Sequence, residues 1–233
     1  ALSRIAPMAI FVSNMLQMED VKEAVIADVS FTHANTIVQE ACFLYCSCIH
    51  YLLNNVTDPL RAQKAFELAL RLSTSDLACS IDYENSLSCL MWIQEAKNLS
   101  DLSDSFEHGS HRFLLSSYST LTDVEFAKHG FVLSFYFLLK AAKEVERMGI
   151  DDLSEQFYFD AIRETIALGG DTAANAAIVG GIVGAVVGIK RGLPAQMLHT
   201  VLRFDCTSGQ GGEIRDESFS IKKYGVHLAR MLL

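Results

Sequence analysis

Residues 169–188, GGDTAANAAIVGGIVGAVVG, decide the fold, because they join a carboxylate at a helix start to a helix built almost wholly of small residues. Asp171 follows two glycines, in the place of an N-cap or first-turn residue, where free N–H groups and the helix dipole favour a carboxylate. Gly180, Gly184 and Gly188 share one face, so another helix can come close. Because apolar residues cover the remaining sides, the stretch predicts a central helix buried against several neighbours.

Two simpler interpretations of this stretch compete with a functional one. An Asp after Gly-Gly is, in most isolated cases, only a helix cap. The glycine spacing also resembles a dimerisation face of membrane helices. Polar residues at 171 and 175 and the basic pair at 190–191 bound the apolar run. It is therefore shorter than the roughly 18–20 residues that a membrane span needs.

Length and composition predict one compact helical domain over residues 1–233. Half of the residues are hydrophobic and only 3 are proline. The net charge of −9 argues against binding to nucleic acid or to anionic membrane surfaces. The six cysteines form no CxxC pair and fall on apolar helix faces, which indicates reduced thiols in an intracellular, cytoplasmic protein.

Apolar periodicity predicts further helices over residues 19–29, 37–53, 58–70, 73–99, 126–147, 153–168, 193–204 and 218–233. A capping box at 122–125 starts one of them, and Gly149 ends it. Polar residues predict surface loops over 98–112 and 208–217. No strand pattern is convincing, so the sequence predicts an all-α multi-helix bundle with the glycine-rich helix at its centre.

The other candidate polar residues give weak signals by themselves. His33 precedes a predicted helix and by default is a polar loop residue. His108 and His111 lie three apart, but because no third ligand is evident we expect solvated loop residues. We expect His129, inside a helix, to be structural. Glu125 and Asp160 fit ordinary roles on helix surfaces.

The sequence Gly169-Gly170-Asp171-Thr172, followed by Asn175-Ala176-Ala177-Ile178, resembles the ADP-ribosylglycohydrolase family. This family includes ADP-ribosyl-arginine and ADP-ribosyl-serine hydrolases and jellyfish lens crystallins of the same fold. Its pattern, Gly-Gly-Asp-Thr-Asp-Thr-Asn-Ala, places two aspartates and a threonine around a pair of magnesium ions. Asp171 matches the first aspartate and is the expected metal ligand. Ala173 and Ala174 stand in place of the second aspartate and the threonine.

Two further segments carry the resemblance, which extends over nearly the whole chain. Residues 1–7, ALSRIAP, resemble the family segment Gly-Ser-Leu-Met-Arg-Ile-Ala-Pro, with Ser3 in place of the methionine. In relatives this turn lies near the substrate diphosphate, which implies substrate binding by Ala1, Leu2 and Ser3. The dipeptide Thr32-His33 matches a family Thr-His in which the histidine lies against ADP-ribose, so the resemblance also implies substrate binding by His33. No residue is assigned as catalytic.

The family reaction is magnesium-dependent hydrolysis of the bond between ADP-ribose and a protein side chain, so the resemblance implies ADP-ribose or an ADP-ribosylated protein as partner. The family's N-terminal Thr-Asp-Asp-Thr segment supplies half of the magnesium ligands, and this chain begins after it. Since one carboxylate cannot organise two hard cations, we expect magnesium binding and activity to be impaired or absent in this chain alone. It is either part of a hydrolase that needs completion or a non-catalytic ADP-ribose-binding or crystallin-like structural relative.

Overall fold

A computed structural model of the chain describes residues 1–77, 83–104, 127–149, 153–189, 192–207 and 214–216. These residues form nine α-helices, two short 3-10 helices and no strand, so the predicted all-α fold is confirmed. The elements are η1 (Leu2–Arg4), α1 (Ala6–Phe11), η2 (Val12–Asn14), α2 (Met18–Ser30), α3 (Thr36–Asn54), α4 (Arg61–Leu72), α5 (Tyr83–Asp104), α7 (Ala127–Met148), α8 (Glu155–Ala167), α9 (Thr172–Val187) and α10 (Ala195–Arg203).

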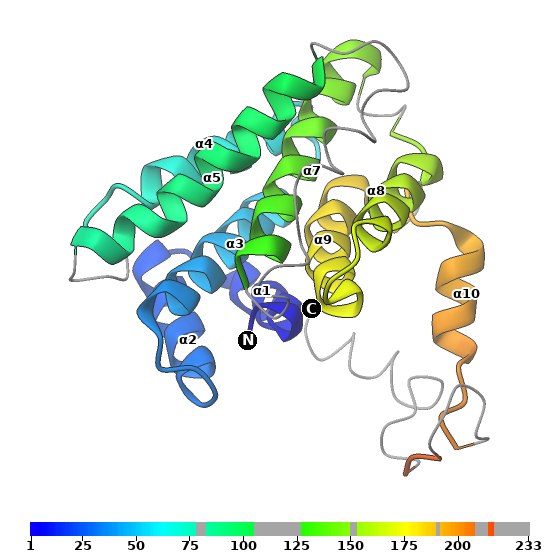
Figure 1. Cartoon of the computed structure of the whole chain (residues 1–233), viewed down its shortest axis with the longest axis horizontal. Coiled ribbons are helices and arrows are strands. Elements are labelled where there is room, and N and C mark those ends of the chain that lie inside the picture. Colours follow the sequence, from blue (N-terminus) through cyan, green and yellow to red (C-terminus); the bar gives the residue numbers. More distant parts are fainter. Residues whose placement is uncertain (78–82, 105–126, 150–152, 190–191, 208–213, 217–233) are drawn as a thin grey trace.

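The glycine-rich helix α9 is central, as the sequence predicts. It packs between α7 and α8 and also contacts α3 and the N-terminal η1 (Figure 1). α3 in turn packs against α1, α2 and α4, and α7 connects α9 to α4 and α5. The buried side chains of α9 are Asn175, Ile178, Val179, Ile182, Val183 and Val186. The first helical turn of the chain, η1, thus lies against the late helix α9.

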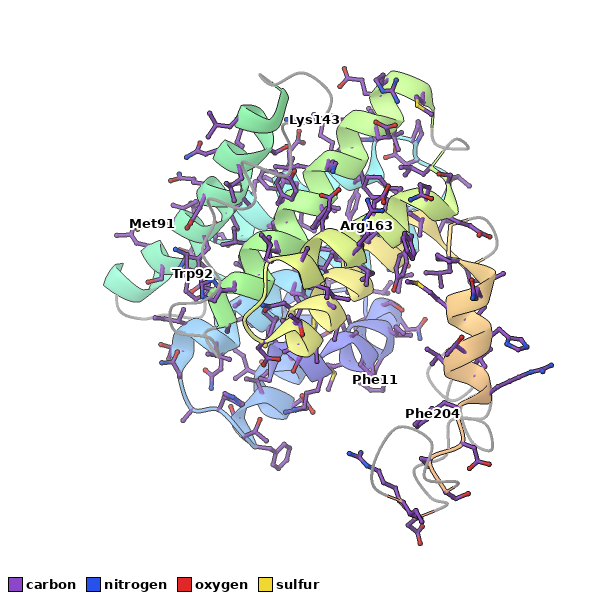
Figure 2. All side chains as sticks on the ribbon, turned by 45° about the vertical axis from the view of Figure 1, so that its right-hand side comes forward. Phe11, Met91, Trp92, Lys143, Arg163 and Phe204 are labelled. Atoms are coloured by element: carbon purple, nitrogen blue, oxygen red, sulfur yellow. The ribbon has the colours of Figure 1, made fainter. Side chains whose placement is uncertain are left out.

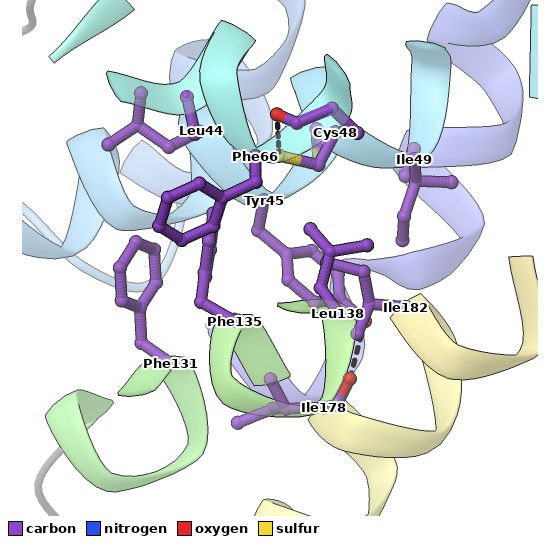
Figure 3. Close-up of a cluster of buried hydrophobic side chains, with 14 of the residues drawn as sticks. Leu44, Tyr45, Cys48, Ile49, Phe66, Phe131, Phe135, Leu138, Ile178 and Ile182 are labelled. Atoms are coloured by element: carbon purple, nitrogen blue, oxygen red, sulfur yellow. Dashed lines mark hydrogen bonds between the residues drawn. The ribbon is translucent and has the colours of Figure 1, made fainter. Parts of the chain in front are cut away.

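Among the glycines of α9, Gly181 has the nearest neighbour to an added Cβ atom. A Cβ atom on Gly181 would lie 2.2 Å from the Tyr45 hydroxyl oxygen, which donates a hydrogen bond to the carbonyl of Ile178 at 2.8 Å (Figure 3). A Cβ atom on Gly180 would likewise lie 2.9 Å from the hydroxyl oxygen of Tyr158 in α8. The face predicted from sequence is therefore only partly correct, because it did not include Gly181.

The other two glycines of the predicted face have different surroundings. At Gly184 the nearest atom to an added Cβ is Tyr158 Cε2 at 3.8 Å, which is ordinary van der Waals contact. Gly188 is the C-cap of α9 with φ 72°, and no atom lies within 4 Å of an added Cβ. Its role is to adopt a left-handed conformation that ends the helix.

Both ends of α9 receive a charge that complements the helix dipole. Asp171 is the N-cap residue. At the C-terminal end the buried Arg61 of α4 donates hydrogen bonds to the carbonyl oxygens of Val186 and Val56. Burial lowers the pKa of Arg61, while Asp58 opposes this effect. A negative group at the start and a positive group at the end are the arrangement that the dipole favours.

The predicted helix end at Gly149 is confirmed, and other local predictions fall on residues outside the description. Asn35 caps α3, accepting a hydrogen bond from the N–H of Val38 at 3.1 Å. Gly149 follows α7 with φ 94°. The predicted capping box at 122–125, His108 and His111 lie outside the described residues, as do the predicted helix at 218–233 and most of the loop at 208–217.

Two predictions of helix bounds are wrong. α5 continues to Asp104, where a loop was predicted. The polar residues there lie on the solvent face of a helix, since Asp101 pairs with Lys97 at 2.5 Å and with Lys143 at 3.3 Å. The helix predicted from residue 58 begins at Arg61. In α8, Phe159 and Ile166 are 39% and 50% exposed. The Arg163 guanidinium (Figure 2) lies 5.7 Å from the Phe159 ring centre and partly covers it.

Within the described residues, α3 is the one helix long and apolar enough to cross a membrane, and 61% of it is buried inside the protein. α3 supplies much of the hydrophobic core, including Phe43, Leu44 and Leu52. α10 shows the opposite environment: none of its residues is buried, and Phe204 just after it is 43% exposed (Figure 2). The five described cysteines are all buried free thiols, as expected from sequence. Cys79 lies outside the described residues.

Glu40 is a carboxyl group buried within α3. Its side chain is 0% exposed, and neither carboxyl oxygen has a hydrogen-bond partner among the described residues. Burial raises the pKa of Glu40 from its ordinary 4.5 to about 7, although Lys22 opposes the shift. The folded state therefore holds a proton that the unfolded state loses in this pH window, and stability falls as pH rises from about 4.5 to about 7.

We expect Glu40→Gln to stabilise the protein at pH 8 by about 2–3 kcal/mol, because it removes the cost of ionising a buried group. At pH 4 the two proteins should have nearly equal free energies of unfolding, since Glu40 is then largely protonated in both the folded and the unfolded state. Urea unfolding at both pH values measures this difference. A stability gap that does not change with pH would contradict the buried, unpaired environment.

Gly181→Ala and Gly184→Ala form a matched pair on one helix. Gly181→Ala should cost about 1–3 kcal/mol, because the new methyl group must displace the buried Tyr45 hydroxyl. Gly184→Ala should be neutral or stabilising by up to about 1 kcal/mol, because alanine favours the helix and the space is open. Thermal unfolding of both variants gives the comparison. Equal changes in stability at the two positions would show that the close contact with Tyr45 does not restrict residue size at Gly181.

Candidate functional site

A cavity of about 340 Å³ opens where η1, the start of α3, α5 and the first turns of α9 meet. Its wall contains all five residues that the resemblance marks as binding residues: Ala1, Leu2, Ser3, His33 and Asp171. These residues come from three separate parts of the sequence. The volume lies within the range of small-molecule binding sites. The structure thus brings the five residues together, and their individual roles in binding stay predictions.

Asp171 is placed at the cavity by the two glycines that precede it. Gly169 and Gly170 have φ values of 79° and 68°, in the left-handed region that glycine adopts most easily. The chain turns there, and Asp171 Oδ1 accepts a hydrogen bond from the N–H of Ala174 at 3.1 Å. Asp171 is therefore a helix cap and a cavity-lining carboxylate at once. The two interpretations of the sequence do not exclude each other.

The two alanines that replace family ligands differ in position. Ala174 lines the cavity, in the first turn of α9 beside Asp171. Ala173 is exposed and is not part of the cavity wall. Neither side chain carries an oxygen, so the first turn of α9 offers the cavity one carboxylate.

The donor set of this cavity does not fit a pair of magnesium ions. Magnesium takes about six oxygen ligands in octahedral geometry, and two ions need several carboxylates between them. Asp171 is the one carboxylate among the described residues of the wall. No group of three or more His, Cys, Asp or Glu side chains suited to a metal occurs in the described part of the chain. We therefore derive no chemical step through bound metal.

The residues considered as substitute ligands do not supply the missing charge. Asp160 lies on α8, pairs with Arg163 at 2.6 Å, and is not in the wall of this cavity. Glu125 lies outside the described residues. His129 is buried within α7 and does not line the cavity, as expected for a structural histidine.

His33 stands on the turn between α2 and α3, at the edge of the cavity. Its Nε2 lies 3.3 Å from the backbone nitrogen of Ala1, and its Nδ1 lies 2.9 Å from the hydroxyl of Thr32. Desolvation lowers the pKa of His33 most, and the positive charge of Arg4 lowers it further. Both effects favour a neutral imidazole.

Sequence reasoning did not assign a role to two wall residues, Asn175 and Trp92. Asn175 is 4% exposed, and its Nδ2 has no hydrogen-bond partner among the described residues. A buried donor without an acceptor is costly, which marks Asn175 as a candidate ligand contact. It belongs to the family-like segment after Asp171, the one signal that could have revealed it. Trp92 of α5 is 7% exposed and packs edge-on against Phe131.

A comparison with known families gives a match that agrees with this geometry. The family model described as ADP-ribosylglycohydrolase matches residues 1–221. This chain belongs to the ADP-ribosylglycohydrolase family. No curated protein and no solved structure matches the chain significantly. Family membership fits the all-α fold and implies ligands related to ADP-ribose, whereas the donor set around Asp171 differs from the family pattern.

The capping role of Asp171 can be tested apart from any ligand. Asp171→Ala should lower the free energy of unfolding by about 1 kcal/mol, because the N–H of Ala174 loses its acceptor. Asp171→Asn retains a side-chain oxygen and should stay close to the wild type. Chemical unfolding of the three proteins measures the difference. An alanine variant as stable as the wild type would show that the cap contributes nothing.

Proposed function

We propose that this chain binds the ADP-ribosyl group in the cavity beside Asp171 and that this chain alone does not hydrolyse the bond to ADP-ribose. The observation that carries the proposal is the cavity itself. Three segments that resemble the family's ligand-binding segments line one cavity, yet its described wall holds a single carboxylate. The described wall therefore retains groups for recognition but offers a single carboxylate for catalysis.

Recognition follows from the donors and acceptors on the wall. The carboxylate of Asp171 uses Oδ1 for the helix cap, which leaves Oδ2 to accept hydrogen bonds from ribose hydroxyls. The start of α9 also directs the positive end of its dipole toward the cavity, which favours an anion there. Backbone groups of residues 1–3 lie on the same wall, where the family resemblance places the diphosphate.

Catalysis would require more than this wall provides. Cleavage of a glycosidic bond needs an acid for the leaving group and a second carboxylate or an activated water to meet the oxocarbenium-like transition state. Asp171 can supply one of these functions at most, and the surroundings of His33 at the cavity edge lower its pKa and so disfavour the protonated form. Hydrolysis would need further ligands or acids beyond the described wall. An intracellular location, expected from the free cysteines, is a further part of the proposal.

Titration of the purified chain with ADP-ribose by calorimetry tests the binding. We expect saturable binding at one site. Ala174→Phe should weaken it at least tenfold, because the side chain fills the cavity from the first turn of α9. Ala177→Phe is the matched control, since Ala177 is exposed on the same helix and is not in the cavity wall. Its affinity should equal that of the wild type.

The same protein, given magnesium and peptides carrying ADP-ribosyl-arginine or ADP-ribosyl-serine, tests the second half of the proposal. We expect no release of ADP-ribose above the rate without protein. Release that Ala174→Phe abolishes would show that the chain is an active hydrolase. Absence of ADP-ribose binding in the wild type would overturn the binding proposal and favour a structural, crystallin-like role.

A further inference from the structure

Arg4 links the two sides of the cavity edge, although it is not part of the cavity wall. Its Nη1 donates a hydrogen bond to Asp28 Oδ2 at 2.7 Å, and its Nη2 lies 3.1 Å from both the Asp28 carbonyl oxygen and Thr32 Oγ1. Arg4 belongs to η1, whereas Asp28 and Thr32 belong to α2 and the turn after it. The planar fork of a guanidinium allows one side chain to hold both partners.

The hydrogen bonds at Thr32 determine which nitrogen of His33 carries the proton. Thr32 Oγ1 accepts from Arg4 at 3.1 Å, and we assign its hydroxyl hydrogen to the carbonyl oxygen of Val29 at 3.4 Å. A hydroxyl has one hydrogen, so Oγ1 acts as an acceptor toward His33 Nδ1, 2.9 Å away. Nδ1 is then the protonated nitrogen.

The contact at Nε2, on the other side of the His33 imidazole, agrees with this assignment. His33 Nε2 lies 3.3 Å from the backbone nitrogen of Ala1, which is a donor. Nε2 must therefore be the acceptor. Hydrogen bonds thus connect Arg4 to Thr32, Thr32 to His33, and His33 to Ala1. This network joins residues 1–4 to residues 32–33.

We propose that Arg4 is a positioning residue that, through Thr32, holds His33 as the neutral Nδ1–H tautomer and fixes residues 1–3 against His33 at the cavity edge. The inference rests on the proposed function, because its consequence is tighter binding of an ADP-ribosyl ligand. Arg4 is 43% exposed and Asp28 is 26% exposed, so the ion pair contributes little to stability. Its loss should act on the site rather than on the fold.

The test compares Arg4→Met and Thr32→Val with two control variants. Thr32→Ser keeps the hydroxyl. Lys64→Met removes an ion pair to Asp58 of the same 2.7 Å length and similar exposure, away from the cavity. Nitrogen-15 NMR of the His33 ring in the free protein reports the tautomer, and calorimetry reports ADP-ribose affinity.

In the wild type we expect the Nδ1–H tautomer. Arg4→Met and Thr32→Val should shift His33 toward the Nε2–H form and weaken ADP-ribose binding about tenfold, a loss of about 1.4 kcal/mol. Melting temperatures should change by less than about 4 °C, the shift that roughly 1 kcal/mol gives. Thr32→Ser and Lys64→Met should behave as the wild type.

An Nε2–H tautomer in the wild type would overturn the proposal, as would variants that leave both tautomer and affinity unchanged. A large loss of stability in Arg4→Met with an unaltered His33 tautomer would assign Arg4 to the fold instead. If the wild type does not bind ADP-ribose at all, the proposed function fails, and the tautomer measurements alone still decide whether Arg4 positions His33.

Discussion

The contact between Tyr45 of α3 and Gly181 of α9 sets the geometry on which the rest of the structure depends. Tyr45 is buried, its hydroxyl is bound to the carbonyl of Ile178, and a Cβ atom on Gly181 would lie 2.2 Å from its oxygen. The same added atom would lie 3.5 Å from Ala6 of α1. Because closely packed interiors yield little, this contact fixes α9 against α3 and the N-terminal helices. Because η1, α3 and α9 carry much of the cavity wall, the contact at Gly181 helps to hold that wall in place.

Asp171 shows how one residue serves both the fold and the site. The left-handed glycines turn the chain, the carboxylate satisfies a free N–H of the helix, and its second oxygen remains for a ligand. Two ions would require a dense cluster of oxygens, and the described wall around Asp171 does not have one. Ala173 and Ala174 alter the site without altering the helix, because alanine favours helical structure. Recognition and catalysis can therefore separate within one fold.

The sequence predicted the parts of the structure that depend on local patterns. Apolar periodicity gave the helices, and family-like segments gave the five residues that now line one cavity. It did not predict Gly181 as the closest contact, because that depends on Tyr45, more than 130 positions away. It also could not show that Arg4, Thr32 and His33 form one network, since their contacts arise from tertiary packing. The polar run after residue 97 was assigned to a loop because polarity alone does not distinguish a loop from the solvent face of a helix, where Lys97 and Asp101 pair.

The structural claim at the centre of this account is that the cavity between η1, His33 and Asp171 is the ADP-ribosyl site. A crystal structure of the chain grown with ADP-ribose tests it most directly. We expect density for the ribose beside the Asp171 carboxylate and for the diphosphate beside the backbone of residues 1–3, with the protein otherwise unchanged. ADP-ribose bound elsewhere on the surface, with this cavity filled only by solvent, would contradict the account.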